Sequence, residues 1–536
     1  MNVTVFYRIG RESFAASASN EHIEVVTDAR ENEKMVRVKA KAKISLQRVT
    51  ESDVARVGKN DRFLLNGYQS WTDTREFTRK ETEKNIYRLP RWLVDRFSFD
   101  RYGDATFYPY SKKKLHGYDV FYSRGERECF FCNLNVANAY LLFEVDRQSG
   151  QVDLISDCDG IEMSRGDEQT VLSYRYAASY ADGMRAFREI FSARRAEKIF
   201  GYTSWYNYYQ NINETQILRD LDAIDSRFDL FQIDDGFETA VGDWLRIDPQ
   251  KFSNGLQPIV DRIHEKGLKA GIWLAPFVAE EKSETYREHP DWFRRDENGN
   301  AIRCGSNWSG FYALDLENLE ARAYIETCLR HYMDLGFDFF KLDFLYAANL
   351  PHYAGKTRSM AAEEAYAFLR DVLQDRLILG CGATVFNAAG KFDYLRVGPD
   401  VSLKFDDVWF MRLMHRERIS TKTTLQNTIY RSFLNGHLFG NDPDVFILRE
   451  NNVSLSAEQR KALLTVNSLF GNVLMTSDCL ADYDDEKKTL LDEALERFRN
   501  AEVQAYERDG DRIRVTYTLG KTEHNFVYDT EKGVLR

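Results

Sequence analysis

Acidic residues follow three separate runs of apolar residues in this 536-residue chain. The runs end in Ile233-Asp234-Asp235, Lys341-Leu342-Asp343 and Gly398-Pro399-Asp400. A single carboxylate after an apolar run could simply be the N-cap of a helix. Three such positions together instead favour a site where carboxyl groups converge, provided that the runs are strands of one closed sheet.

Paired carboxyl groups are typical of enzymes that hydrolyse glycosidic bonds. One carboxylate attacks the sugar and must be ionised, whereas the other must hold a proton for the leaving oxygen. Lys341 precedes Asp343 by two positions, so on a strand both side chains point to the same face. The sequence therefore predicts that Lys341 helps to keep Asp343 ionised, with a structural salt bridge as the alternative.

The elements that would position these carboxylates are apolar strands that alternate with amphipathic helices from about Met184 onward. Eight such units fit a closed (β/α)8 TIM barrel, whose site lies at the carboxyl ends of the strands. An open doubly wound sheet is the alternative, although no G-x-G-x-x-G sequence opens a helix. The expected strands are 199–205, 230–234, 270–275, 337–343, 377–380, 394–397, 444–448 and 473–476.

Short segments of alternating polar and apolar residues flank this central region on both sides. Within residues 1–183 they predict an N-terminal β-sandwich. Residues 184–480 would form the catalytic barrel, and residues 481–536 a C-terminal helix with a small antiparallel β-domain. We therefore expect a multidomain α/β protein, which agrees with a chain too long for one core.

Six short sequences in a fixed order resemble glycoside hydrolase family 36, and within it the compact prokaryotic α-galactosidases. They are S-W-Y-N-Y-Y (204–209), Q-I-D-D-G-F (232–237), G-I-W-L-A-P-F (271–277), K-L-D-F-L-Y (341–346), G-C-G-A (380–383) and R-V-G-P-D (396–400). The resemblance covers residues 201–480 and extends to N-G-Y-Q-S-W at 66–71. Each sequence is weak evidence alone, but their common order is specific.

The resemblance implies a role for each matching residue. Asp343 would be the nucleophile and Asp400 the general acid/base. Asp442 and Asp444 also lie near a predicted strand and are the alternatives to Asp400. The positions that bind the sugar in the family correspond to Trp71, Trp205, Asp234, Asp235, Trp273, Lys341, Cys381 and Arg396.

The function that the resemblance implies is a retaining α-galactosidase. It would remove terminal α-D-galactosyl residues from oligosaccharides such as melibiose or raffinose by double displacement. The nearest alternative is a same-family α-N-acetylgalactosaminidase or galactosyl transglycosylase. A metal-dependent barrel enzyme is another, because Asp235, Asp343 and Asp400 could hold Mg²⁺. A non-catalytic sugar-binding protein is the last alternative, but it would not need both catalytic carboxylates.

Composition restricts the partners and the compartment. The net charge of −11 and the pI near 5.5 disfavour nucleic acid as a partner. No apolar run is long enough to span a membrane, and the N-terminal segment lacks the pattern of a signal peptide. Seven cysteines, an odd number, indicate free thiols and predict a cytoplasmic location. We expect no cofactor, no metal ion, an α-galactoside as the small-molecule partner, and a monomer or small homo-oligomer.

Overall fold

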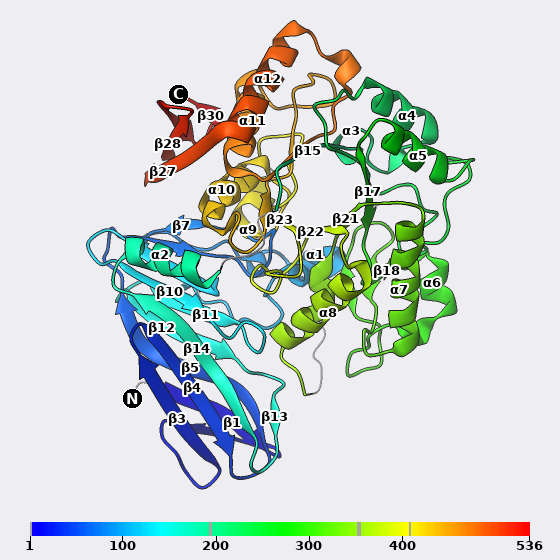
Figure 1. The fold of residues 1–536 in the computed structure, drawn as a ribbon. Helices are drawn as coiled ribbons and strands as arrows, with labels where there is room; N and C mark the ends of the chain where they lie inside the picture. The colour runs from blue at the N-terminus through cyan, green and yellow to red at the C-terminus, as the bar shows by residue number, and fades with distance from the viewer. Residues whose placement is uncertain (1–2, 192–195, 351–354, 407–408) are drawn as a thin grey trace.

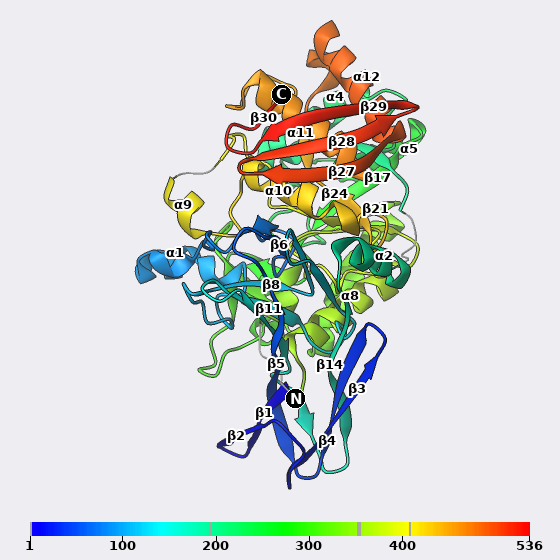
Figure 2. The ribbon, with the colours of Figure 1, turned by 90° about the vertical axis from the view of Figure 1, so that its left-hand side faces the viewer.

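The computed structural model describes residues 3–191, 196–350, 355–406 and 409–536. A β-sandwich, a β/α barrel and a small antiparallel sheet follow one another along the chain (Figure 1). In Figure 2 the sandwich lies at one end of the molecule and the C-terminal sheet at the other. This arrangement confirms the predicted fold class, a TIM barrel flanked by two β-regions.

The barrel sheet is parallel throughout and closes on itself. Its segments are β15 (Ile199–Thr203), β16 (Leu230–Ile233), β17 (Lys269–Leu274), β21 (Phe339–Leu342), β22 (Leu377–Gly380), β23 (Tyr394–Arg396), β24 (Gly440–Asp442), β25 (Val445–Phe446) and β26 (Val473–Thr476). Neighbouring segments pair in the order β24-β23-β22-β21-β17-β16-β15-β26-β25. Only Pro443 and Asp444 separate β24 from β25, so these two pieces of one strand complete an eight-stranded barrel.

The interrupted strand β24–β25 differs from its prediction. The expected strand was 444–448, whereas pairing with β23 already begins at Gly440. Asn441 and Asp442 are polar, so no apolar alternation marks this part of the strand in the sequence. The interruption has a local cause: Pro443 has no backbone N–H, and Asp444 takes a left-handed conformation with φ 72°.

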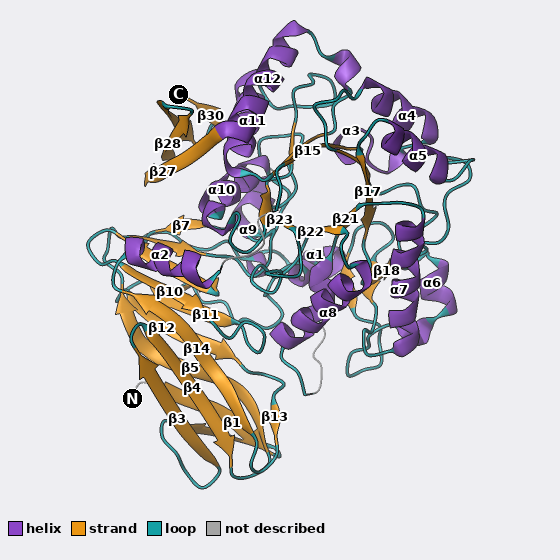
Figure 3. Cartoon of the chain, in the orientation of Figure 1, coloured by secondary structure: helices purple, strands orange, loops and turns teal. Residues whose placement is uncertain are grey.

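Helices surround the barrel strands (Figure 3). They include α4 (Glu214–Ala223), α5 (Gln257–Glu265), α7 (Leu319–Asp334), α8 (Arg358–Leu373), α10 (Thr421–Tyr430) and α11 (Ala457–Phe470), with the shorter α3 (Trp205–Tyr208), α6 (Glu284–Glu288) and α9 (Trp409–Met414). The sequence predicts a helix over Leu319–Asp334, and α7 has these bounds, because Asn318 caps its first N–H groups and an apolar stripe is buried. Within the described ranges no helix is long and apolar enough to cross a membrane.

A three-stranded sheet is inserted between β17 and α7. It consists of β18 (Val278–Glu280), β19 (Arg303–Gly305) and β20 (Phe311–Ala313), in the order β18-β20-β19. The turn between β19 and β20 carries Trp308, whose φ of 54° lies in the left-handed region. No expected strand fell in this insertion, because its segments are too short to show an alternation.

Two antiparallel sheets form the N-terminal sandwich, and their facing apolar side chains form its core. One sheet has the order β2-β1-β5-β12-β11-β8 with β13 beside β5, and the other has the order β3-β4-β14-β10-β9-β6-β7. The strands are β1 (Val3–Ile9), β2 (Glu12–Ala16), β3 (Ile23–Arg30), β4 (Glu33–Ala40), β5 (Ile44–Arg56), β6 (Arg62–Leu65), β7 (Arg75–Phe77), β8 (Lys114–Tyr118), β9 (Val120–Arg124), β10 (Cys129–Asn133), β11 (Leu141–Asp146), β12 (Gln151–Asp157), β13 (Glu162–Met163) and β14 (Glu168–Ala177). Helix α1 (Arg91–Phe97) lies between β7 and β8, and α2 (Tyr180–Ile190) leads into the barrel.

The C-terminal region contains one helix and one antiparallel sheet, and the sheet agrees with the predicted fold class. The elements are α12 (Asp485–Asn500), β27 (Ala501–Asp509), β28 (Arg512–Leu519), β29 (Thr522–Asp529) and β30 (Val534–Leu535). The four strands pair in sequence order. The side chains of Ile513, Val515 and Tyr528 are buried in a hydrophobic core that also contains barrel residues. The exact boundaries between the three regions stay predictions from the sequence.

Arg431, which directly follows α10, joins the sandwich to the barrel. Its buried guanidinium donates to the carbonyl oxygens of Ser70, at 2.6 Å, and Val397, at 2.9 Å. It also donates to one side chain and two further carbonyls within residues 66–69. Since the segment 66–71 ends in Trp71, Arg431 holds this sandwich residue against the carboxyl end of β23.

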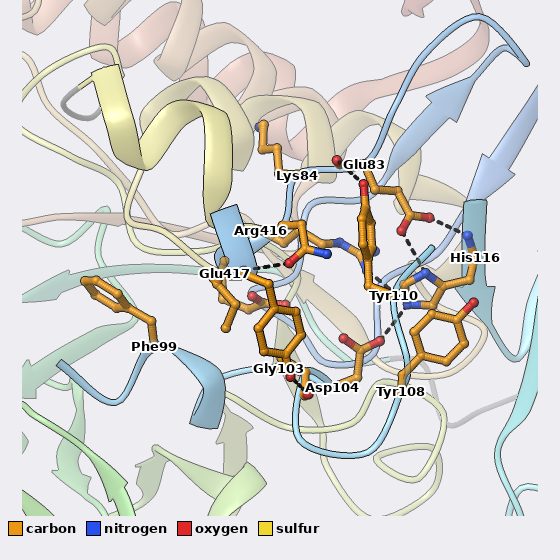
Figure 4. A pocket seen from close by; sticks show the side chains of 14 residues that line it. Glu83, Lys84, Phe99, Gly103, Asp104, Tyr108, Tyr110, His116, Arg416 and Glu417 are labelled. Atoms are coloured by element: carbon orange, nitrogen blue, oxygen red, sulfur yellow. Dashed lines mark hydrogen bonds and ion pairs between the residues drawn. The ribbon is translucent and has the colours of Figure 1, made fainter. Parts of the chain in front are cut away.

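A second buried cluster lies at the same interface (Figure 4). His116 of β8 contacts Glu83 at 2.8 Å and Asp104 at 2.7 Å, and the guanidinium of Arg416 lies 3.2 Å from the same imidazole. Burial alone would lower the pKa of His116, but the two carboxylates raise it to about 9. Arg416 belongs to the segment between Asp400 and α10, so the cluster fixes that segment to the sandwich.

The Arg431 contacts predict a large loss of stability in Arg431→Met. The substitution removes five hydrogen bonds and leaves buried carbonyl groups without donors. Because each unsatisfied buried group costs about 1–3 kcal/mol, the free energy of unfolding should fall by at least about 3 kcal/mol in urea titrations.

The matched control is Arg37→Met, which removes a sandwich arginine from exposed ion pairs with Asp28 and Glu168. Exposed pairs contribute little, so the midpoint of unfolding should hardly move. Equal midpoints for the two variants would contradict the structural role of Arg431.

Candidate active site

The predicted site residues gather at the carboxyl ends of the barrel strands. Asp343 directly follows β21, and Asp234 and Asp235 directly follow β16. The register of the sheet sets Trp273 of β17 beside Lys341 of β21. These residues therefore meet at one mouth of the barrel, as a closed parallel sheet requires.

Asp343 is held by two N–H donors. The indole N–H of Trp273 donates to its Oδ2 at 3.1 Å, and the backbone N–H of Phe344 donates to its Oδ1 at 2.8 Å. Burial raises the pKa of Asp343 to about 6; the Lys341 charge and both donors lower it, whereas the Asp400 charge raises it. Phe344 has a φ of 54°, an uncommon conformation for a bulky residue and one that often marks functional sites.

Lys341 forms its ion pair with Asp234, not with Asp343. Its ammonium lies 2.8 Å from Asp234 Oδ2, and both side chains are buried. Burial would lower the pKa of Lys341, but the Asp234 carboxylate raises it, so the lysine is a fixed cation. The positive charge of Lys341 still lowers the pKa of Asp343, as expected, but without direct contact. The structural salt bridge that was the alternative role of Lys341 is formed with Asp234.

Arg396, the last residue of β23, binds three carboxylates. Its Nε lies 2.7 Å from Asp442 Oδ2, its Nη1 lies 2.8 Å from Asp400 Oδ1, and its Nη2 lies 2.8 Å from Asp444 Oδ1. The pairing of Arg396 with Asp442 across β23 and β24 sets this geometry. One buried guanidinium thus binds all three carboxylates, Asp400, Asp442 and Asp444, that the sequence indicated as candidates for the general acid/base.

Exposure separates these three carboxylates. The Asp400 side chain is 33% exposed, whereas those of Asp442 and Asp444 are each 1% exposed. Asp444 also accepts hydrogen bonds from the Val401 N–H, at 2.7 Å, and from the Tyr206 hydroxyl. Burial raises the pKa of Asp444 to about 7, against the lowering effect of Arg396. The geometry therefore favours Asp400 for proton exchange with a substrate.

Asp235 is bound by two residues that the sequence did not indicate. The indole N–H of Trp308 donates to its Oδ2 at 2.9 Å, and the Gln210 amide donates to Oδ1 at 3.1 Å. Trp308 lies on the inserted β19–β20 turn, and Gln210 follows α3. Neither residue stands in a recognisable motif or at the end of a strand, so no sequence pattern indicated a role for them.

Aromatic rings line the same mouth. Trp273 contacts Trp244 and Trp308 in edge-to-face geometry, with centroid distances of 5.7 and 6.1 Å. Trp71 reaches the site from the sandwich, with its ring 5.3 Å from that of Phe344. The buried indole N–H of Trp71 has no hydrogen-bond partner among the residues that the structure describes. A donor left free in this position suits a ligand hydroxyl.

The two remaining predicted residues, Cys381 and Trp205, lie at the same end of the barrel. Cys381 directly follows β22, and its buried thiol has a pKa raised by burial and influenced by Arg396, Asp343 and Lys341. Trp205 begins α3, separated from the end of β15 by one residue, and contacts Tyr209 at a centroid distance of 5.1 Å. Trp205 is only partly buried, which suits a residue at the wall of a pocket.

The carboxylates that the metal-dependent alternative requires have other partners in this structure. Asp343 and Asp235 each accept hydrogen bonds from N–H donors, and Asp400 binds Arg396. Within the ranges that the structure describes, no three His, Cys, Asp or Glu side chains are grouped as metal ligands.

Residues 180–377 match the protein family described as melibiase. An α-galactosidase from Escherichia coli is 28% identical over 151 residues, which are 25% of this chain and 21% of that protein. The bifunctional α-galactosidase/sucrose kinase AgaSK from Mediterraneibacter gnavus is 26% identical over 197 residues, 35% of this chain and 20% of that protein. The match thus spans about a fifth of the length of these curated relatives.

Solved structures are similar over nearly the whole chain. TtGalA, an α-galactosidase from Thermus thermophilus in complex with p-nitrophenyl α-D-galactopyranoside, is 26% identical with a TM-score of 0.73, covering 93% of this chain and 98% of that one. AgaA, a GH36 α-galactosidase from Geobacillus stearothermophilus, has a TM-score of 0.63 over 94% of this chain and 72% of its own. At 13% identity, the likeness to AgaA concerns the fold alone.

The melibiase match covers the first half of the barrel, and the Thermus structure extends the likeness to the flanking β-regions. These findings confirm the resemblance that the six short sequences indicated. Residues 180–377 are thus similar to the melibiase family, and the fold of nearly the whole chain is similar to that of solved α-galactosidases.

Proposed function

We propose that this protein is a retaining α-galactosidase that removes terminal α-D-galactosyl residues from oligosaccharides. The observation that carries the proposal is a pair of carboxyl groups with different surroundings at one barrel mouth. Asp343 is fixed by two N–H donors, whereas Asp400 is partly exposed and bound by Arg396. The likeness to a Thermus enzyme solved with an aryl α-galactoside supports a galactoside as the substrate.

The reaction would proceed by double displacement. Asp343 attacks the anomeric carbon while Asp400 donates a proton to the leaving oxygen, which gives a β-galactosyl-enzyme. Asp400 then takes a proton from water, the water attacks from the α face, and α-galactose leaves. Trp273 and Phe344 hold the attacking carboxylate through their N–H groups, and Arg396 orients Asp400 through its Oδ1.

The opposite side of the mouth would recognise the sugar hydroxyls. Asp234 and Asp235 can accept hydrogen bonds from the O4 and O6 hydroxyls, and Lys341 can donate to O3 and O4. A sugar that lacks one of these hydroxyls would leave a buried charged group unpaired, which is costly. Tryptophan rings offer an apolar face to the C–H surface of the sugar and exclude water.

An α-N-acetylgalactosaminidase needs room for the N-acetyl group at C2 of the sugar. The family resemblance implies that Cys381 and Arg396 lie near this position. Both residues are buried, and Arg396 is occupied by three carboxylates. Comparing an aryl α-galactoside with its N-acetyl analogue separates the two activities. The cytoplasmic location and the oligomeric state stay predictions from the sequence.

Azide rescue should distinguish the two catalytic carboxyl groups. In Asp343→Gly, azide should occupy the space of the missing carboxylate and attack an activated aryl α-galactoside, giving β-galactosyl azide. In Asp400→Gly, the galactosyl-enzyme should still form when the leaving group is good, and azide needs no general base. Azide should then enter from the α face and give α-galactosyl azide, as product NMR would show.

The same anomer from both variants would refute the assigned roles. A rescue seen only in Asp442→Gly or Asp444→Gly would transfer the acid/base role to one of those residues.

The raised pKa of Asp343 predicts an acidic limb in the pH profile. The nucleophile attacks only when ionised, and its pKa is raised to about 6, so kcat/KM should fall about tenfold per pH unit below about pH 6. Trp273→Phe keeps an aromatic ring but removes the N–H donor that lowers this pKa. The variant should therefore shift the limb to higher pH.

Initial rates of aryl α-galactoside hydrolysis across the acidic range measure both effects. A wild-type limb near the ordinary aspartate pKa of about 3.9, left unmoved by Trp273→Phe, would show that burial does not govern the nucleophile.

A further inference from the structure

Two carboxyl groups lie buried beside the sugar-binding edge without a cation. Asp235 is 2% exposed and Glu238 is 5% exposed. Among the described residues, no lysine, arginine or histidine forms an ion pair with either of them, whereas the neighbouring Asp234 has Lys341 at 2.8 Å. Burial of an unpaired charge is costly, so this pair needs another way to reduce its charge.

A tight turn at Gly236 connects Asp235 to Glu238. Gly236 has a φ of 118°, and a Cβ there would lie 2.7 Å from the backbone of Gln210, so only glycine fits. The N–H of Gly236 donates to Glu238 Oε2 at 3.2 Å, and Glu238 forms an isolated β-bridge with Ile247. The backbone therefore fixes where the Glu238 carboxyl group lies.

The charges around the pair favour a proton on Glu238. Burial and the Asp235 charge raise the pKa of Glu238 well above its ordinary value. Burial also raises the pKa of Asp235, but hydrogen bonds from Glu238, Gln210 and Trp308 lower it. Two carboxyl groups in contact cannot both ionise, and the one with more donors keeps the negative charge.

The other titratable groups near Asp235 and Glu238 do not neutralise the charge of this pair. The ammonium of Lys251 binds the backbone carbonyls of Gln210 and Gly236, at 2.9 and 2.8 Å. Tyr332 of α7 lies near Glu238, but its hydroxyl donates to the carbonyl of Trp244. Asp234 adds only a further negative charge, which raises the pKa of Asp235.

We propose that Glu238 is a neutral carboxylic acid whose hydroxyl donates to Asp235 and fixes this carboxylate for a sugar hydroxyl. The proposal deepens the proposed α-galactosidase function and rests on it. Trp308, Gln210 and Glu238 then supply three donors to Asp235. A carboxylate has about four acceptor sites, so one direction is left for the substrate. Glu238 is thus a positioning residue that sets the affinity for the sugar.

The test compares Glu238→Gln with Glu238→Ala in the full-length enzyme. The amide of glutamine keeps a neutral donor of the same shape, whereas alanine removes it. With an aryl α-galactoside, Glu238→Ala should raise KM about tenfold or more and change kcat less than about threefold. Glu238→Gln should keep both constants near those of the wild type.

The pH dependence of KM distinguishes positioning from packing. In the wild type, KM should rise at alkaline pH, where Glu238 loses its proton and the pair becomes doubly charged. Glutamine has no proton to lose, so this rise should be absent in Glu238→Gln. If Glu238→Ala does not fold, the comparison of the wild type with Glu238→Gln still tests the proposal. An equal alkaline rise in the wild type and Glu238→Gln would overturn the proposal.

An infrared measurement keeps this inference separate from the proposed activity. At neutral pH, the difference spectrum between the wild type and Glu238→Gln should contain the carbonyl band of a protonated carboxylic acid. The matched control is Glu51→Gln, because Glu51 is a buried sandwich carboxylate paired with Lys34, and its difference spectrum should contain a carboxylate band instead. A carboxylate band for Glu238 would overturn the inference even if the wild type hydrolyses galactosides. An acid band in a wild type that does not hydrolyse them would refute the activity alone.

Discussion

The barrel mouth depends on one guanidinium, that of Arg396. Three carboxylates surround it, and two of them are fully buried. Without this cation, the negative charges of Asp400, Asp442 and Asp444 would repel one another at close range. The interruption between β24 and β25 contributes to this arrangement. Asp444 lies in the interruption in a left-handed conformation, and its carboxylate forms an ion pair with Arg396. The loop after β23 is then anchored by the Val401 N–H on Asp444.

The other carboxylates around the barrel mouth must also have their negative charges stabilised, and each is stabilised by different partners. Asp234 has a lysine, Asp343 has two N–H donors, and Asp235 has donors that include a second carboxyl group. These differences in surroundings give chemically equal side chains different roles, as hydrolysis with two carboxyl groups demands. The sandwich completes the mouth with Trp71, which Arg431 holds in place from the barrel side.

The sequence predicted the barrel and the positions of its carboxylates well, because both follow from periodicity along the chain. The range of α7 and the strand ends before Asp234 and Asp343 are local features, visible in a single segment. The partners of Arg396 were not predictable, since they depend on the register between β23 and β24. Trp308 and Glu238 were missed for a similar reason: both lie in short turns, and only tertiary packing brings them to Asp235.

The stereochemistry of hydrolysis tests the central claim, that two carboxyl groups of different character act in succession at this mouth. Proton NMR of an aryl α-galactoside reaction, recorded before mutarotation, identifies the anomer that forms first. Double displacement through Asp343 predicts α-galactose as the first product. Prompt appearance of β-galactose would mean direct attack by water and would contradict a nucleophilic Asp343.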